Sequence, residues 1–188
     1  MTCQYNSSVM SILKVARMGH PVLRAKARPI EPGEIATANV QRLVDDMIDT
    51  MIEYRGVGLA APQVHEGLRL FVAALDTGDT GEEHQGARSE PIALINPDIT
   101  MVGADTVEDW EGCLSVPDIR GRVPRAREIK VRAYDRQGAR IEIHAQDFVA
   151  RVIQHETDHL DGILFFDRMR SFETLTFLDE YSRYWVKD

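Results

Sequence analysis

Cysteine is scarce in this chain, and no long apolar run interrupts it. The two cysteines, Cys3 and Cys113, stand far apart in the 188 residues, which suggests free thiols in a reducing compartment and not a disulfide framework. No stretch approaches the ~18 apolar residues of a membrane span. Residues 1–14 lack the charged start and apolar run of a secretory signal. We therefore expect a cytoplasmic protein.

Clusters of basic residues are also absent. Lysine and arginine together number 22 against 30 acidic residues, so the formal net charge is -8, and the acids are spread along the chain. Nucleic acid and anionic membrane surfaces attract positively charged proteins. We expect neither as a binding partner.

The string H-E-T-D-H, from His155 to His159, is the most informative motif. If 147–160, which contains no glycine or proline, forms a helix, both imidazoles project from nearly the same side and can reach one metal ion. Glu156 then lies beside that ion, where it can take a proton from water. Apolar residues one and two turns earlier place these side chains on a largely buried face, which argues against a surface helix with solvated histidines. The pattern predicts metal-assisted hydrolysis with Glu156 as general base.

Two histidines do not complete a catalytic metal site, which usually has three protein ligands and one open position. Cys113, in W-E-G-C-L-S-V-P at 110–117, is the upstream candidate, although a lone cysteine is more often a small buried apolar residue. The turn-like Glu-Gly before it and Pro117 after it suggest a constrained strand end that could hold a thiolate rigidly. The alternative third ligands are downstream carboxylates: Asp161, Asp167, Glu173, Asp179 and Glu180.

A glycine-rich segment, G-V-G-L-A-A-P-Q at 56–63, imitates a dinucleotide-binding fingerprint. That fingerprint follows a strand, whereas the apolar residues before this segment recur at helical spacing, and Pro62 falls where the following helix should run. The dinucleotide interpretation therefore fails. The glycines instead allow backbone to approach a ligand, and Gln63 adds a neutral hydrogen-bond donor.

The pattern as a whole predicts one α+β domain over 1–188, with antiparallel β-sheets packed around a central C-terminal metal-site helix. A second helix is expected over 38–54, and the polar stretch 76–90, which contains His84, is expected to be a surface loop. Four segments are predicted as strands, the last two joined by a hairpin turn: 68–75, 91–99, 128–135 and 139–145.

Together, the three motifs resemble those of the peptide deformylases. That family carries G-x-G-x-A-A-x-Q, then E-G-C-L-S, then H-E-x-D-H, and this chain has all three in the same order at 56–63, 111–115 and 155–159. The resemblance runs from about residue 12 to about residue 168, and 12–23 is similar to the family's first strand. The resemblance to the family is weaker over residues 1–11 and 169–188.

The resemblance implies roles for individual residues. The metal ligands would be Cys113, His155 and His159. Glu156 would take a proton from water and pass it to the leaving amine. Gln63 and the backbone N–H of Leu114 would stabilise the oxyanion that forms on a formyl carbonyl. The metal would be one divalent ion, Fe²⁺ in cells, although Zn²⁺, Ni²⁺ and Co²⁺ suit the same ligands.

The implied substrate is the N-formyl-methionyl end of a newly made polypeptide, with formate as the second product. Gly58 would hydrogen-bond an extended peptide, and Val57, Phe148 and Val152 are candidates for the methionine pocket, with Arg120 at its rim. The last stretch has no basic extension, so contact with the ribosome is expected to be transient or to use another surface.

Three further features of the sequence lead to expectations. Arg151, one turn before His155, stands where the family has an apolar residue, so its charge must reach water or a carboxylate. Arg125 and Asp158 are expected to form an ordinary surface salt bridge in preference to a pair that supports the metal ligands from behind. A short C-terminal helix is expected to bury three residues: Leu175, Leu178 and Trp185.

Two other functions are consistent with the motifs. A zinc peptidase would use the same helix with Glu173, Asp179 or Glu180 as third ligand, and it would not need Cys113. A non-catalytic metal-binding or peptide-binding protein would keep the fold without turnover. Glu156 and Gln63 argue against that second possibility, because holding a metal requires neither.

Overall fold

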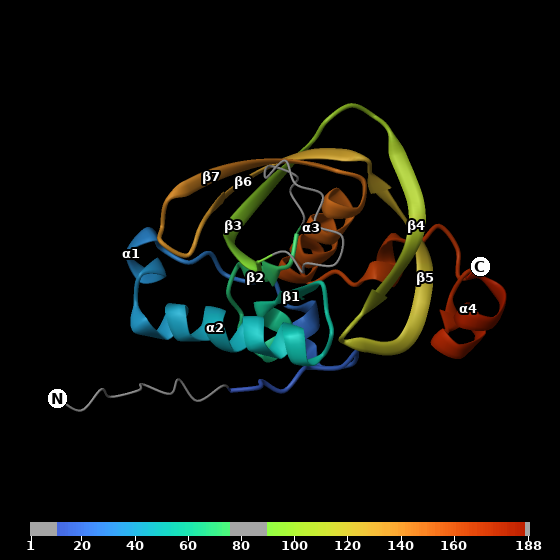
Figure 1. Ribbon diagram of the computed structural model, residues 1–188, viewed down its shortest axis with the longest axis horizontal. Helices are drawn as coiled ribbons and strands as arrows, with labels where there is room; N and C mark the ends of the chain where they lie inside the picture. Colours follow the sequence, from blue (N-terminus) through green and yellow to red (C-terminus); the bar gives the residue numbers. More distant parts are fainter. Residues whose placement is uncertain (1–10, 76–89, 187–188) are drawn as a thin grey trace.

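The computed structural model describes residues 11–75 and 90–186 (Figure 1). Cys3 and almost all of the predicted surface loop, His84 included, lie outside these ranges. Within the described residues, no helix is long and apolar enough to cross a membrane.

A five-stranded antiparallel sheet has the order β1-β2-β3-β6-β7. Its strands are β1 (Gly58–Ala60), β2 (Leu70–Ala73), β3 (Ile92–Met101), β6 (Glu128–Tyr134) and β7 (Arg140–Gln146). The four strands predicted from the sequence are β2, β3, β6 and β7, so those predictions are confirmed. Strand β1 was not predicted, and it contains Gly58, Leu59 and Ala60 from the middle of the glycine-rich motif.

A second antiparallel sheet has the order β4-β5-β8 and was not predicted. Its strands are β4 (Thr106–Cys113), β5 (Val116–Ala126) and β8 (Thr176–Phe177). Strands β4 and β5 form a long hairpin whose register runs from Thr106 opposite Ala126 to Cys113 opposite Val116. The sequence does not indicate this hairpin, because both strands are rich in charged residues. Strand β5 also contains Pro117, Gly121 and Pro124, which are uncommon inside strands.

In the described part of the chain, four α-helices accompany the sheets: α1 (Pro32–Ile35), α2 (Ala38–Glu53), α3 (Asp147–Leu160) and α4 (Leu178–Tyr184). Helices α2 and α3 match the predicted ranges closely. The chain turns away just after α3 at Gly162, where φ is +73° and a Cβ would stand 2.6 Å from the carbonyl oxygen of Arg24. Only glycine accommodates both the left-handed backbone and this close approach.

Helix α3 is the central helix, as predicted (Figure 1). Its buried residues Ala150, Ile153 and Leu160 share one apolar cluster with Phe71 and Leu94 of the five-stranded sheet. Full burial of an aliphatic side chain such as Ile153 stabilises the fold by roughly 1.5–3 kcal/mol. The helix also contacts β5. Because it packs against both sheets, its position relative to each of them is fixed.

Two predictions about the ends of the domain are wrong. Residues 12–23 form no strand, because no single partner strand pairs with them: the Ala16 N–H donates to the Gln63 carbonyl and the Met18 N–H to the Ser115 carbonyl, both at 2.7 Å. Helix α4 has no buried residue, and Trp185 is 48% exposed. The helix lies on the outside of the β4–β5 hairpin (Figure 1).

Candidate metal centre

Helix α3 and the end of strand β4 bring three predicted ligands together. His155 and His159 lie one turn apart on the buried side of α3, and Cys113 is the last residue of β4. One potential ligand atom from each lies within 4.8 Å of the other two, and the Cys113 Sγ and His159 Nε2 atoms are 3.2 Å apart. A thiolate and two imidazoles at this spacing could hold one divalent metal ion.

The charges of this group favour the thiolate that a metal requires. Burial by itself would raise the pKa of Cys113, but the attraction of His159 and hydrogen bonds with both histidines outweigh it, so the pKa lies well below the usual value. Burial would likewise lower the pKa of His155, yet its hydrogen bonds with Cys113 and Glu111 raise it well above the usual value. Without a metal the site therefore tends toward a thiolate–imidazolium pair.

Glu156 is buried beside the two histidines, with 4% of its surface exposed. Burial raises the pKa of its carboxyl, although the positive charges of His155 and His159 act against this effect. Within the described residues its Oε2 atom has no hydrogen-bond partner. A Cβ at position 58 would stand 2.4 Å from Glu156 Oε1, so Gly58 is needed to leave room for this carboxylate.

The turn that follows β1 orients the side-chain amide of Gln63 toward Cys113. Its Oε1 atom accepts a hydrogen bond from the Ala60 N–H at 2.8 Å. The Nε2 group consequently faces the other way, where it donates to Ser115 Oγ at 3.2 Å and approaches Cys113 Sγ at 3.5 Å. The amide is buried and held at both ends, so it offers N–H donors beside the candidate metal ligands.

A cavity of about 510 Å³ opens beside these residues, and the other predicted site residues line it. The lining includes Leu114 and all five residues predicted to bind substrate: Val57, Gly58, Arg120, Phe148 and Val152. Val152 is buried, whereas Phe148 is 61% exposed. We therefore place Phe148 at the mouth of the cavity and Val152 deeper inside.

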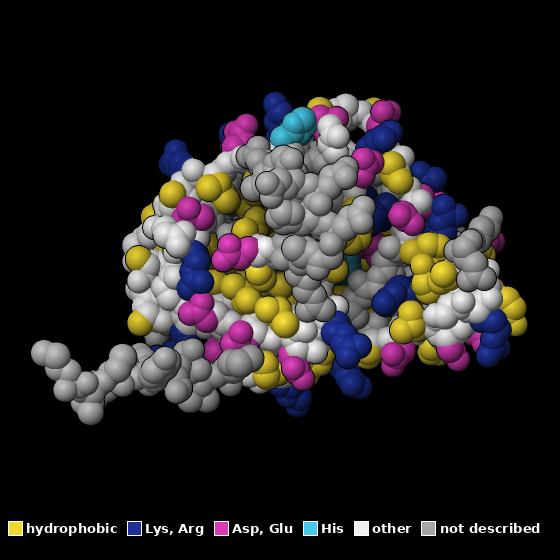
Figure 2. Space-filling model, viewed as in Figure 1, with side chains coloured by type: hydrophobic (Ala, Val, Ile, Leu, Met, Phe, Trp, Pro, Cys, Tyr) yellow, Lys and Arg dark blue, Asp and Glu magenta, His cyan; other side chains and the backbone are white. Residues whose placement is uncertain are grey.

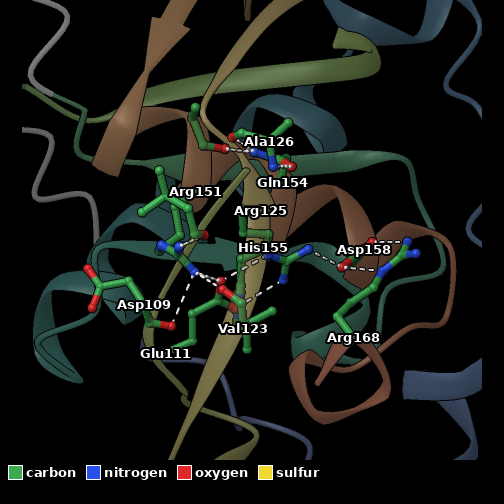
Figure 3. Close-up of polar contacts among 12 residues, drawn as sticks. Asp109, Glu111, Val123, Arg125, Ala126, Arg151, Gln154, His155, Asp158 and Arg168 are labelled. Carbon is green, nitrogen blue, oxygen red and sulfur yellow. Dashed lines mark hydrogen bonds and ion pairs between the residues drawn. The ribbon is translucent and has the colours of Figure 1, made fainter. Parts of the chain in front are cut away.

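Glu111 is a buried carboxylate for which the sequence suggested no role. Its Oε2 atom accepts a hydrogen bond from His155 Nδ1 at 2.9 Å (Figure 3). Arg125 donates to both oxygens of the same carboxylate, from Nε at 2.9 Å and from NH2 at 3.0 Å. A hydrogen bond at Nδ1 fixes the orientation of an imidazole and leaves its Nε2 as the metal-binding atom.

Arg151 is buried, and its guanidinium reaches the same carboxylate. Its NH1 group donates to Glu111 Oε1 at 2.7 Å and to the Val123 carbonyl at 2.8 Å, while NH2 donates to the Val107 carbonyl at 2.7 Å (Figure 3). These bonds tie α3 to both strands of the β4–β5 hairpin. Of the two destinations expected for this charge, water and a carboxylate, it reaches the carboxylate.

The prediction of a surface salt bridge between Arg125 and Asp158 is wrong. Both residues are buried, and Arg125 NH1 donates to Asp158 Oδ2 at 2.5 Å. Arg168 NH2 donates to the other oxygen of Asp158 at 2.7 Å, so a chain of ion pairs runs from Arg168 to His155 (Figure 3). A signal for this network was present in the sequence, because Asp158 and Arg151 lie on a helix predicted to be mostly buried, where charges need partners.

Glu111 should make the stability of the metal-free protein depend on pH. Burial would raise the pKa of its carboxyl, but hydrogen bonds from His155 and Arg125 outweigh burial and lower the pKa from 4.5 to about 2. A carboxyl group whose pKa is lowered by folding stabilises the fold above its unfolded pKa, and this contribution is lost as the pH falls through the folded value. We expect a loss on the order of 3 kcal/mol in the free energy of unfolding between about pH 5 and pH 2.

Urea unfolding of the metal-free protein at a series of pH values measures this loss. Glu111→Gln should flatten the dependence over that interval, and Glu142→Gln, at an exposed position of β7, should leave it unchanged. The same slope in Glu111→Gln as in the wild type would show that Glu111 does not carry the effect.

A buried Cys-His-His group, with the cysteine on a strand and the histidines and a neighbouring carboxylate on a helix between antiparallel sheets, is the arrangement of a metal-dependent hydrolase. Comparison with known proteins identifies the family. The sequence model of the polypeptide deformylase family matches residues 12–174. This chain belongs to that family, whose members are metal-dependent hydrolases.

Individual relatives agree with this assignment. The chain is 46% identical to peptide deformylase 2 of Nostoc sp. over 160 residues, which are 85% of this chain and 87% of the relative. Among solved structures, the Met-Ala-Ser-bound class I type b peptide deformylase of Acinetobacter baumannii has a TM-score of 0.77 at 38% identity, covering 85% of this chain and 99% of that one. The deformylase of Thermotoga maritima has a TM-score of 0.74 at 38% identity, with the same coverage.

Proposed function

We propose that this chain removes the N-formyl group from the N-terminal formyl-methionine of newly synthesised polypeptides and releases formate. One observation carries the assignment of the site: Cys113, His155 and His159 meet within 4.8 Å, and Cys113 and His155 line a cavity that Glu156 and Gln63 also line. This arrangement provides metal donors, a base and an amide donor in one place. Hydrolysis of a formamide requires these three kinds of group.

The proposed metal ligands are Cys113, His155 and His159, and the ion is Fe²⁺ in cells. The donors fit a divalent transition metal, because the low pKa of Cys113 favours its thiolate and the Glu111 carboxylate already holds His155 at Nδ1. Zn²⁺, Ni²⁺ and Co²⁺ suit the same donors. When bound, such an ion supplies a Lewis acid that lowers the pKa of water in the site.

Glu156 acts as the general base and then as the general acid. It takes a proton from water as the water oxygen adds to the formyl carbon, and it gives that proton to the methionine nitrogen as the C–N bond breaks. The raised pKa of this buried carboxyl suits a group that must both accept and return a proton. The products are formate and a free amino terminus.

Gln63 and Leu114 stabilise the charge that develops on the formyl oxygen. The Nε2 group of Gln63 is already oriented toward Cys113, and Leu114 directly follows this cysteine, so the Leu114 N–H lies beside the same point. A fixed donor of this kind contributes roughly 3–4 kcal/mol to stabilising a tetrahedral transition state. Glutamine supplies it without adding a charge beside Glu156.

The methionine side chain occupies the pocket lined by Val57, Phe148 and Val152, with Arg120 at its rim. The backbone of Gly58, at the start of the short edge strand β1, hydrogen-bonds the extended peptide. The Acinetobacter baumannii relative was solved with Met-Ala-Ser bound, which supports a peptide ligand here. Contact with the ribosome is transient or uses another surface in this proposal.

Formate release tests the proposed function directly. Iron-loaded protein, kept anaerobic, should release formate from formyl-Met-Ala-Ser and leave unformylated Met-Ala-Ser intact. Removal of the metal with a chelator should abolish the release, and returning Fe²⁺ should restore it. No formate, together with cleavage of internal peptide bonds, would instead identify a peptidase.

The geometry gives little support to the zinc-peptidase alternative. Among the described residues, the possible metal-binding group of His, Cys, Asp and Glu side chains consists of Cys113, His155 and His159. Glu173 is exposed, and Asp179 and Glu180 belong to the outer helix α4, so the proposed downstream ligands lie outside this group.

A further inference from the structure

The C-terminal segment formed by β8 and α4 contributes to the wall of the cavity. Leu178, the first residue of α4, lines the cavity together with Trp110 of β4 and Arg120 of β5. The match to the polypeptide deformylase family ends at residue 174, so this part of the wall comes from a segment beyond the matched region. Figure 1 shows α4 lying against the outside of the β4–β5 hairpin.

Specific contacts hold this segment in place. Strand β8 pairs with β5, with Phe177 opposite Ile119. The ring of Trp110 lies 4.8 Å from the ring of Tyr181 and 5.2 Å from that of Trp185, measured between centroids. Hydrophobic side chains consequently gather over this end of the molecule (Figure 2). Aromatic contacts of this kind fix α4 on the hairpin, although the helix buries none of its own residues.

Strand β4 connects this wall to the candidate metal ligands, because Trp110, Gly112 and Cys113 all line the cavity. A Cβ on Gly112 would stand 1.8 Å from Arg120 NH1, so the guanidinium covers that glycine, and the register of β4 is irregular between Glu111 and Cys113. Trp110 precedes Cys113 by three residues, or about 10 Å along a strand. An extended substrate that runs beside β4 with its formyl group at Cys113 would have its third residue level with Trp110, because its rise per residue is similar.

We propose that Leu178 and Trp110 bind an apolar side chain at the third residue of the formylated peptide, so that the C-terminal segment sets part of the enzyme's substrate preference. This proposal rests on the proposed function. Both side chains are only half-buried, and they are continuous with the cavity that contains Cys113. An apolar substrate residue placed between them removes further apolar surface from water, which favours its binding.

Deformylation of formyl-Met-Ala-Leu and formyl-Met-Ala-Ser by the metal-loaded protein tests this proposal. We expect wild type to prefer the leucine peptide by about fivefold in kcat/KM, mainly through KM, because a half-exposed apolar contact discriminates less than a closed pocket. Leu178→Ala should bring the ratio of the two kcat/KM values close to one, and Leu178→Met should restore it. Phe177→Ala is the matched control, since Phe177 is adjacent, apolar and 65% exposed but does not line the cavity.

Each contrary result has a distinct meaning. Formate from both peptides with equal kcat/KM in wild type, or an unchanged ratio in Leu178→Ala, would overturn this inference and leave the proposed function standing. No formate from either peptide would overturn the proposed function itself, and this inference with it. If sedimentation showed a dimer that Leu178→Ala dissociates, a second copy of the chain would cover Leu178, and the inference would be wrong.

Discussion

Cys113→Ala should lose bound metal and formate release together. The change removes the only sulfur donor of the group and leaves His155 and His159 as two neutral donors, too few for a catalytic site. Because loss of even an outer hydrogen-bond partner typically costs 10–100-fold in metal affinity, we expect a loss of at least about 100-fold here. Metal content after dialysis and the dissociation constant for Co²⁺, followed by its absorption spectrum, measure this loss apart from activity.

Cys3→Ala provides the matched control, because it removes the other cysteine of the chain. It should retain metal, the thiolate-to-cobalt absorption and formate release at wild-type levels. Full metal content and full activity in Cys113→Ala would show that the third ligand lies elsewhere. That result would favour the peptidase alternative with a downstream carboxylate.

Glu156→Gln should retain metal but lose most of its activity. The amide has nearly the shape of the carboxylate, so it fits the space that Gly58 leaves, yet it cannot take a proton from water. General acid–base catalysis typically contributes 10²–10⁴-fold, and we expect kcat to fall by about that factor. Metal analysis, thermal unfolding and the rate of formate release on the same preparation separate catalysis from folding.

The pH profile gives a second check on Glu156. In wild type, kcat/KM should fall on the acid side as the Glu156 carboxyl becomes protonated, at a pH above the usual range for glutamate because burial raises its pKa. This acid limb should be absent from the residual activity of Glu156→Gln. Glu53→Gln, at an exposed position of α2, is the matched control and should keep the wild-type rate and profile. An acid limb that survives in Glu156→Gln would assign it to another group.

The strands of the five-stranded sheet and the helix that carries the histidines could be predicted because their signals are local. Strand β6, for example, has the buried alternation expected of a sheet that packs on one face, and α3 repeats its apolar residues every three or four positions. The β4–β5 hairpin carries no such signal. Its two strands stabilise each other through pairing, and charged residues such as Arg125 are buried because partners from α3 neutralise them.

The sequence by itself determined the chemical groups of this site: a thiol, two imidazoles one helical turn apart, a carboxylate beside them and an amide upstream. Only the tertiary structure decided how they are oriented. Glu111, Arg125 and Arg151 come from β4, β5 and α3, and they meet because the hairpin folds over the central helix. The same packing sets Leu178 into the cavity wall. Helical periodicity acts over a few residues and is visible in the sequence, whereas these contacts join segments that are distant in the chain and form only when the sheets pack around the helix.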